Sequence, residues 1–277
     1  MILSGTLTCV AGNPGHDSSV TTLVVSSDGR WVATASGAST IILWDARDAY
    51  ISQEWFSPGG VVSDLAFSPD SRHLASASED GKVTIWDISG NSRQVASLEG
   101  HLSVIRSCAW SSNGAYIASQ ARDRSVRLRD GRTFQPLPLI PDMTGSRPLF
   151  SPDSHWLLVP KGSGMICIWD MATKQECLLL KSYEGSIYDM AFSPDGRLLL
   201  SASWNDNSLE VWNTHTGAMV QSLDEHTRAV VKVCFSPCGQ YIASASTDKT
   251  VKVWRTSDGS CLATVIGSGM LHSLPMG

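Results

Sequence analysis

The sequence has few charged residues, no excess of basic ones and no cysteine motif. Charged residues make up 17 % of the 277 residues, and the net charge at pH 7 is −5. A general nucleic-acid-binding protein needs a basic surface, so a nucleic-acid partner is not expected. The seven cysteines are scattered and odd in number, without a CxxC pair, so the sequence predicts neither a disulfide framework nor a zinc site. A reducing intracellular compartment, the cytoplasm or the nucleus, is expected.

Long hydrophobic runs and the common catalytic signatures are missing as well. No run reaches the ~18 apolar residues of a membrane-spanning helix, and residues 1–16 lack the basic start of a secretory signal. There is no HExxH, no Walker P-loop and no GxGxxG after a strand. We therefore expect no membrane segment, no cofactor and no metal. A possible metal group of His215, Asp224, Glu225 and His226 is set aside, because His226 belongs to the repeat described next.

What the sequence does contain is a repeated pattern, best formed over residues 226–254. Alternating apolar residues meet a turn at 236–239, and two further apolar runs follow, separated by a polar turn at 246–249. Period-two runs with turn residues between them predict antiparallel strands. Four polar or aromatic residues hold fixed offsets in this stretch: His226, Ser244, Asp248 and Trp254.

The period of the pattern indicates a ring of similar units. Positions matching Trp254 recur at spacings of 42, 43, 40, 43 and 42 residues, namely Trp212, Trp169, Arg129, Trp86 and Trp44. A period of about 40–45 residues is typical of propeller blades. The pattern resembles the WD40 repeat, and the resemblance covers nearly the whole chain.

The resemblance implies an all-β propeller of six four-stranded blades within residues 1–266. The repeats are expected at about 5–45, 50–87, 94–130, 134–170, 176–213 and 218–255, with an outer strand at 261–266 and a flexible tail at 267–277. Residues 6–10 and 261–266 both suit the outer strand of the last blade, and a six-bladed ring needs only one of them. An incomplete seven-bladed propeller is therefore the alternative.

The resemblance also implies a hydrogen-bonded network of His, Ser or Thr, Asp and Trp inside each blade. A buried indole N–H needs an acceptor, and a hydroxyl can both donate and accept. The residues at these positions are His16, Thr34, Trp44, Ser76, Asp80, Trp86, His101, Ser119, Asp123, Trp169, Ser201, Asp206, Trp212, His226, Ser244, Asp248 and Trp254. Units one, three and four depart from the pattern, with Ala38 and Ser163 at the Asp position, Val159 at the hydroxyl position and Arg129 at the Trp position.

A Ser-His-Asp trio invites comparison with hydrolases, and we reject that interpretation. The trio recurs in several units, and the chain has no GxSxG nucleophile turn. We expect a structural role for these residues and no enzymatic activity.

Unit three carries five arginines between residues 122 and 132, and prolines crowd the region that follows. The arginines suit solvated strand edges in a drifted repeat, a basic patch for an acidic partner or, least well, a nucleic-acid site. Proline cannot donate to a strand ladder, so irregular backbone is expected around Pro136, Pro138, Pro141 and Pro148.

These features favour a non-catalytic scaffold that binds proteins or peptides on the top face of the propeller, within a multi-protein complex. The alternatives are a sensor or adaptor fragment of a larger signalling protein and an enzyme built on a propeller. Carried over from the family, the top-face positions are Glu79, Arg106, Arg122, Tyr188, Trp204 and Asn205. Arg, Tyr and Trp often dominate interface energies. We expect an acidic group of the partner near unit three and an apolar anchor near unit five.

Overall fold

A computed structural model describes residues 15–47, 50–89, 94–143, 147–162, 164–181, 186–203 and 205–266. The predicted strand at 6–10, the predicted tail at 267–277 and the candidate binding residue Trp204 lie outside these residues, and so does Ser163. Every regular element of the described part is a β-strand. The prediction of an all-β fold is confirmed.

The first three sheets follow one another along the chain. Blade 1 contains β1 (Val20–Val25), β2 (Trp31–Ser36), β3 (Thr40–Asp45) and β4 (Tyr50–Phe56). Blade 2 contains β5 (Val62–Phe67), β6 (His73–Ser78), β7 (Val83–Asp87) and β8 (Gln94–Leu98). Blade 3 contains β9 (Ile105–Trp110), β10 (Tyr116–Ala121) and β11 (Val126–Asp130).

The other three sheets have four strands each. Blade 4 contains β12 (Leu149–Phe150), β13 (Trp156–Lys161), β14 (Met165–Asp170) and β15 (Gln175–Lys181). Blade 5 contains β16 (Ile187–Phe192), β17 (Leu198–Ser203), β18 (Leu209–Asn213) and β19 (Met219–Leu223). Blade 6 contains β20 (Val230–Phe235), β21 (Tyr241–Ser246), β22 (Thr250–Arg255) and β23 (Cys261–Ile266). Strand β23 thus takes the outer position of the last blade.

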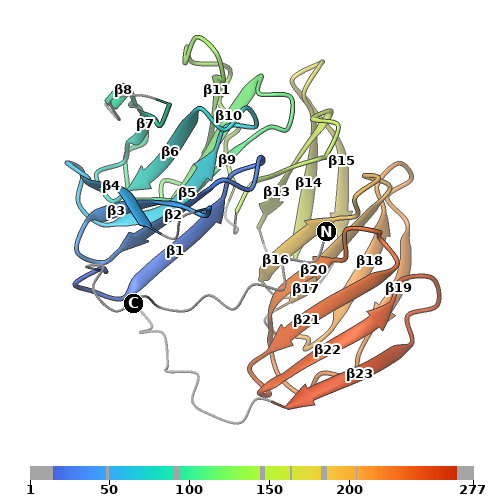
Figure 1. The fold of residues 1–277 in the computed structure, drawn as a ribbon. Helices are drawn as coiled ribbons and strands as arrows, with labels where there is room; N and C mark the ends of the chain where they lie inside the picture. The colour runs from blue at the N-terminus through green and yellow to red at the C-terminus, as the bar shows by residue number, and fades with distance from the viewer. Residues whose placement is uncertain are drawn as a thin grey trace.

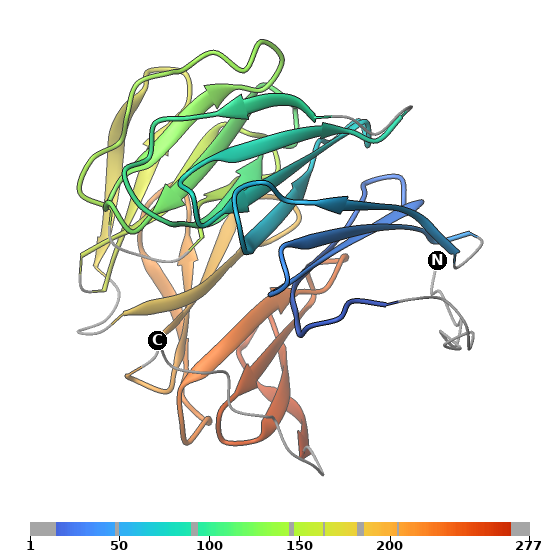
Figure 2. The ribbon, with the colours of Figure 1, turned by 90° about the vertical axis from the view of Figure 1, so that its left-hand side faces the viewer.

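Each sheet is antiparallel and uses its strands in chain order, so every blade is a meander. Figures 1 and 2 show the six sheets arranged around a common centre, and the first strands of several blades pack on one another there. The expected propeller of six blades is confirmed. We call the face with the turns between second and third strands the top face, and the face with the turns between first and second strands the bottom face.

Blade 3 differs from the others at its outer edge. In place of a fourth strand, isolated bridges pair Val126 with Ile140 and Arg129 with Pro136. The expected fourth strand of this blade is therefore replaced by irregular backbone, as the four prolines predicted. The physical reason is that a proline has no N–H to give to the ladder of β11.

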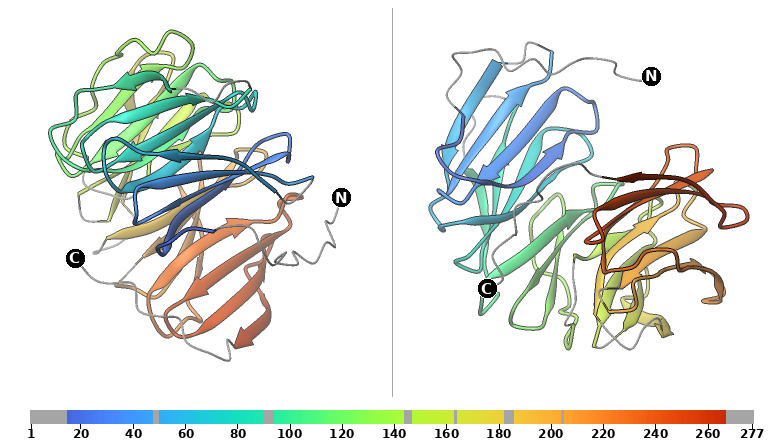
Figure 3. Two further views of the ribbon diagram at one scale, coloured as in Figure 1. Left: turned by 60° about the vertical axis from the view of Figure 1, so that its left-hand side comes forward. Right: turned by 90° about the horizontal axis from the view of Figure 1, so that it is seen from below.

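Apolar residues from neighbouring blades meet in shared clusters. There are five such clusters among the described residues, and each joins two consecutive blades, from blades 1 and 2 to blades 5 and 6. Within the described residues, no cluster joins blade 6 to blade 1. Figure 3 (right) shows the β1–β4 sheet in blue and the β20–β23 sheet in red at the two ends of this series. We call the space between those two sheets the open side.

Candidate functional site

The polar network of blade 6 links β21, β22 and the turn between them with the loop before β20. His226 Nε2 lies 2.8 Å from Ser244 Oγ, and the indole Nε1 of Trp254 donates to the same oxygen at 2.9 Å. On its other side, His226 Nδ1 lies 2.8 Å from Asp248 Oδ2. His226 and Trp254 are buried, so the chain of bonds satisfies groups that water does not reach.

The Asp248 carboxylate also holds the turn between β21 and β22. Its oxygens accept hydrogen bonds from the Thr250 hydroxyl at 2.6 Å and from the backbone N–H of Thr227 at 3.1 Å. Burial alone would raise the pKa of Asp248, but the bonds from Thr250 and His226 hold that pKa well below its ordinary value. The carboxylate therefore stays ionised and fixes the turn that borders the top face.

Blade 3 keeps the same arrangement without the tryptophan. His101 lies 2.9 Å from both Asp123 Oδ2 and Ser119 Oγ. Burial opposes it, yet the backbone N–H of Leu102 and the side chains of Ser125 and His101 lower the pKa of Asp123 to about 2. Arg129, at the Trp position of this blade, donates from Nη2 to the backbone carbonyl of Glu99. The long Arg129 side chain therefore extends past the position that the indole occupies in other blades and reaches the backbone of Glu99.

Arg129→Trp is expected to leave stability unchanged or to raise it. The indole would donate to Ser119, as Trp254 does to Ser244, while the bond to the Glu99 carbonyl would be lost. Thermal unfolding of the variant, compared with that of Arg129→Ala, measures the effect of the new bond. A clear loss of stability relative to the native protein would show that the bond to Glu99 matters more than the restored network.

Blades 1 and 2 build partial networks. In blade 1, His16 Nε2 lies 2.8 Å from Thr34 Oγ1, and Nδ1 lies 2.9 Å from Thr40 Oγ1, which replaces the missing aspartate. The Trp44 indole donates to Thr34 at 2.9 Å.

Blade 2 has no histidine in this position. There the Trp86 indole donates to Ser76 Oγ at 2.8 Å, and Asp80 accepts from the Ser78 hydroxyl at 2.7 Å. A side chain at Gly59 would collide with the Asp80 carboxylate, because a Cβ there would lie 2.4 Å from it. The carboxylate therefore fits only because residue 59 has no side chain.

Blade 4 breaks the network, and the assignment of Trp169 to it was wrong. The indole Nε1 of Trp169 is buried without a hydrogen-bond partner among the described residues, because Val159 offers no hydroxyl. In blade 5 the Trp212 indole donates to Ser201 Oγ at 3.1 Å. Asp206 is exposed and accepts from the Ser203 hydroxyl at 2.8 Å.

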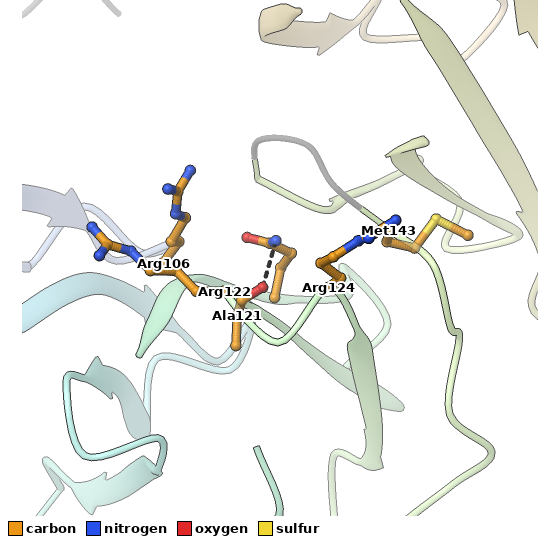
Figure 4. A pocket seen from close by; sticks show the side chains of 6 residues that line it. Arg106, Ala121, Arg122, Arg124 and Met143 are labelled. Carbon is orange, nitrogen blue, oxygen red and sulfur yellow. Dashed lines mark hydrogen bonds between the residues drawn. The ribbon is translucent and has the colours of Figure 1, made fainter. Parts of the chain in front are cut away.

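The top face of blade 3 carries a hollow of about 340 Å³, which we call the arginine pocket (Figure 4). It is lined by Arg106, Gln120, Ala121, Arg122, Arg124 and Met143. Arg106 comes from β9, Arg122 and Arg124 from the turn after β10, and Met143 from the irregular outer segment. The sequence placed Arg106 and Arg122 together on this blade, and they line the same pocket.

The arginine pocket has a surplus of positive charge and one unsatisfied acceptor. No carboxylate of the described residues forms an ion pair with Arg106, Arg122 or Arg124. Gln120 is only 2 % exposed, and its Nε2 donates to the backbone carbonyl of Ala121 at 2.9 Å. Its Oε1 is buried without a partner among the described residues, and such an acceptor is costly to leave unpaired. A ligand with both an acid group and an N–H would suit this pocket.

Three residues of the pocket were not predicted from the sequence: Gln120, Arg124 and Met143. Gln120 comes directly after the repeated hydroxyl position of its unit. Other units have smaller residues at the place of Gln120, and this difference could have pointed to it.

The five arginines of unit three do not form a single patch. Two of them line the pocket, whereas Arg127 and Arg129 extend from β11 and Arg132 lies in the following turn.

The remaining top-face candidates lie apart from the arginine pocket. Tyr188 at the start of β16 is 42 % exposed, and Asn205 in the turn after β17 is exposed. Glu79 in the turn after β6 is exposed as well. None of these three lines the arginine pocket.

Two ion pairs near the centre of the propeller, each with an aspartate of a first strand, were not predicted from the sequence. Arg147 Nε lies 3.5 Å from the Asp64 carboxylate, which also accepts the backbone N–H of Cys108 at 3.0 Å. Burial raises the pKa of Asp64, and the Arg147 guanidinium opposes that rise. Lys232 lies 3.0 Å from Asp189, whose carboxylate accepts the N–H of Val233 at 2.9 Å. In both cases an aspartate ties one blade to the next.

The part of the chain that the structure describes holds no group of three or more His, Cys, Asp or Glu side chains suited to a metal ion. It also contains no helix with the length and apolar character needed to cross a bilayer.

Comparison with known proteins agrees with this architecture. The chain is 28 % identical over 250 residues to the serine-threonine kinase receptor-associated protein of Gallus gallus, covering 88 % of this chain and 69 % of that protein. It is 28 % identical to Protein hir-1 of Neurospora crassa and 25 % identical to Periodic tryptophan protein 2 of Arabidopsis thaliana. Those matches cover 74 % and 90 % of this chain but only 19 % and 28 % of the two relatives.

A family model described as "WD domain, G-beta repeat" matches residues 7–45, 53–87, 92–130, 176–213 and 217–255. These matches cover well over half of the chain and omit blade 4, where the network is broken. The chain belongs to the WD40 repeat family.

Proposed function

We propose that this protein is a non-catalytic scaffold that binds an acidic peptide segment of a partner protein in the arginine pocket on its top face. The observation that carries the proposal is the uncompensated charge of Arg106, Arg122 and Arg124 beside the buried, unpaired Oε1 of Gln120. Arginine forms two parallel hydrogen bonds with a carboxylate, and a peptide N–H would satisfy Gln120.

A peptide suits this pocket better than a free anion does. An anion alone supplies only acceptors, and Gln120 Oε1 needs a donor. The apolar side chain of Met143 adds a surface for the stem of a glutamate or for a neighbouring residue. Tyr188, Asn205, Glu79 and Trp204 are the proposed further contacts of a longer partner that crosses the top face.

The setting of this interaction is part of the proposal. We propose an intracellular protein, in the cytoplasm or the nucleus, that acts within a multi-protein complex. The free cysteines among the described residues agree with a reducing compartment. Because the chain spans less than a third of two of its relatives, a role as the sensor or adaptor part of a larger assembly remains the second candidate.

Arg106→Ala combined with Arg122→Ala is expected to weaken binding of glutamate-rich peptides at least ~10-fold, as the loss of charged anchors does at interfaces. Peptide arrays followed by calorimetry measure this loss, and the melting temperature is expected to stay nearly unchanged. Arg72→Ala removes an exposed arginine beside a turn of the bottom face and serves as the matched control. Equal peptide affinity of the double variant and the control would contradict the proposal.

A further inference from the structure

Blade 3 carries two arginines at positions where blade 6 has one lysine and one tryptophan. Arg127 of β11 matches Lys252 of β22, and Arg129 matches Trp254. Residues two apart in a strand share a face of the sheet, and both arginines are half-buried. Burial lowers the pKa of Arg129, and the charge of Arg127 lowers it further. The two guanidinium groups therefore repel each other.

The lysine of blade 6 has a carboxylate partner that the arginines of blade 3 lack. Lys252 Nζ lies 3.2 Å from the carboxylate of Glu225, which comes directly before His226. In blade 3 the residue directly before His101 is Gly100. The three matched positions of blade 6 thus hold one cation and one anion, whereas those of blade 3 hold two cations and no anion. This part of blade 3 needs two negative charges to become neutral.

The carboxylates of the neighbouring segments are already engaged. Glu99 forms an ion pair with Lys82 at 2.9 Å, and Asp123 lies 2.9 Å from His101. Asp123 also accepts a hydrogen bond from the hydroxyl of Ser125 at 2.7 Å. Among the described residues, no carboxylate forms an ion pair with either arginine. The described part of the chain therefore leaves their charge to an anion from solution or from a partner.

Gly100 lies against the Arg127 guanidinium. A Cβ on Gly100 would lie 3.0 Å from Nη1 of Arg127, so the guanidinium group packs on an exposed glycine. The Nε of Arg127 is buried without a hydrogen-bond partner among the described residues, whereas Arg129 donates from Nη2 to the backbone carbonyl of Glu99. A charge without a counter-charge and a donor without an acceptor are both unfavourable. Arg127 is thus held at the connection between β8 and β9 with its charge uncompensated.

We propose that Arg127 and Arg129 bind a phosphate group beside Gly100. A phosphate monoester carries a charge of about −1.5 to −2 at pH 7, which matches the two guanidinium charges, whereas a carboxylate carries only one negative charge. Arginine also binds phosphate through two parallel hydrogen bonds. This phosphate site is distinct from the arginine pocket, which neither residue lines, and it does not depend on the function proposed above.

Calorimetric titration with inorganic phosphate, at an ionic strength held constant with sodium chloride, tests the phosphate site directly. Arg127→Met removes the charge but keeps an unbranched side chain against Gly100. It is expected to weaken phosphate binding at least ~10-fold, because it removes charge-assisted hydrogen bonds. Arg132→Met, which removes an exposed arginine from the next turn, is the matched control. Equal phosphate affinity of the two variants would overturn the proposal.

The melting temperature in chloride buffer separates binding from folding. Arg127→Met is expected to keep or raise this temperature, since it removes a repulsion between like charges. If Arg127→Met does not fold, Arg129→Trp takes its place, because it leaves one cation at the site, as in blade 6. Arg129→Trp is also expected to weaken phosphate binding at least ~10-fold, and unchanged affinity would count against the proposal.

The arginine pocket is a competing site for the same probe. The double variant with Arg106→Ala and Arg122→Ala is expected to keep its phosphate affinity and to lose only peptide binding. If phosphate binding is lost in this double variant and kept in Arg127→Met, phosphate binds in the arginine pocket and the proposal falls. Loss of phosphate binding in Arg127→Met alone would support the phosphate site, whatever the result with the acidic peptides.

A phosphoserine peptide and its unmodified form distinguish the source of the phosphate. Tighter binding of the phosphoserine peptide than of inorganic phosphate, reduced in Arg127→Met, would identify a phosphorylated segment of a partner. Equal affinity for the two phosphate probes would identify the free ion. If the native protein bound neither probe, the proposal would be wrong.

Discussion

Trp254→Ala is expected to lower the free energy of unfolding by about 3–5 kcal/mol, the range found when a buried tryptophan is truncated. Trp254 is 1 % exposed and belongs to the apolar cluster between blades 5 and 6. Its loss would leave a cavity in that cluster and would also remove the donor to Ser244. Urea unfolding followed by circular dichroism measures the effect without depending on the deleted fluorophore.

Trp44→Ala is the matched control for this change. Trp44 makes the same indole bond, to Thr34 at 2.9 Å, but it is only half-buried because blade 1 faces the open side. We expect a clearly smaller loss of stability for Trp44→Ala. Similar losses for both variants would show that the hydrogen bond, rather than packing between blades, sets the effect.

Asp248→Ala is expected to lower the free energy of unfolding by about 1–3 kcal/mol, because it leaves buried donors without their acceptor. His226 and the hydroxyl of Thr250 both lose a partner. Asp87→Ala serves as the control, since Asp87 accepts hydrogen bonds from the exposed Ser89 at the end of its strand. Equal urea midpoints for the two variants would contradict the structural role given to Asp248.

The difference in unfolding free energy between the native protein and Asp248→Ala is also expected to depend on pH. The folded-state pKa of Asp248 lies below its ordinary value of 3.8, so the ionised group stabilises the folded state above about pH 4. That contribution is lost as the pH falls toward the folded-state pKa. The difference in stability between the native protein and Asp248→Ala is therefore expected to be constant from pH 5 to 7 and to shrink below about pH 4.

Much of the fold followed from local sequence. The outer strand predicted at 261–266 has those bounds in the structure, because alternation and turn residues act over a few positions. Val159 stands where other units have a hydroxyl, and this replacement also indicated the weak network of blade 4. Local patterns of this kind fix strands and turns without reference to the rest of the chain.

The features that were missed depend on segments far apart in the sequence. Arg147 and Asp64 belong to different blades, and no periodic pattern connects them. Gln120 of β10 and Met143 of the irregular outer segment line the same pocket, and no periodic pattern connects them either. Leu23 and Leu65 occupy the same position of their repeats, and only the presence or absence of a preceding blade makes one exposed and the other buried.

The consecutive order of strands in every sheet has a consequence for folding kinetics. No described sheet contains a strand from a distant part of the chain. The loops that must close during folding are therefore short, and the entropy lost in closing them is small. Each blade can form as soon as its ~40–45 residues leave the ribosome. Until the next blade is synthesised, however, the newest one exposes an apolar face. The nascent chain therefore needs protection from aggregation at every stage of its synthesis.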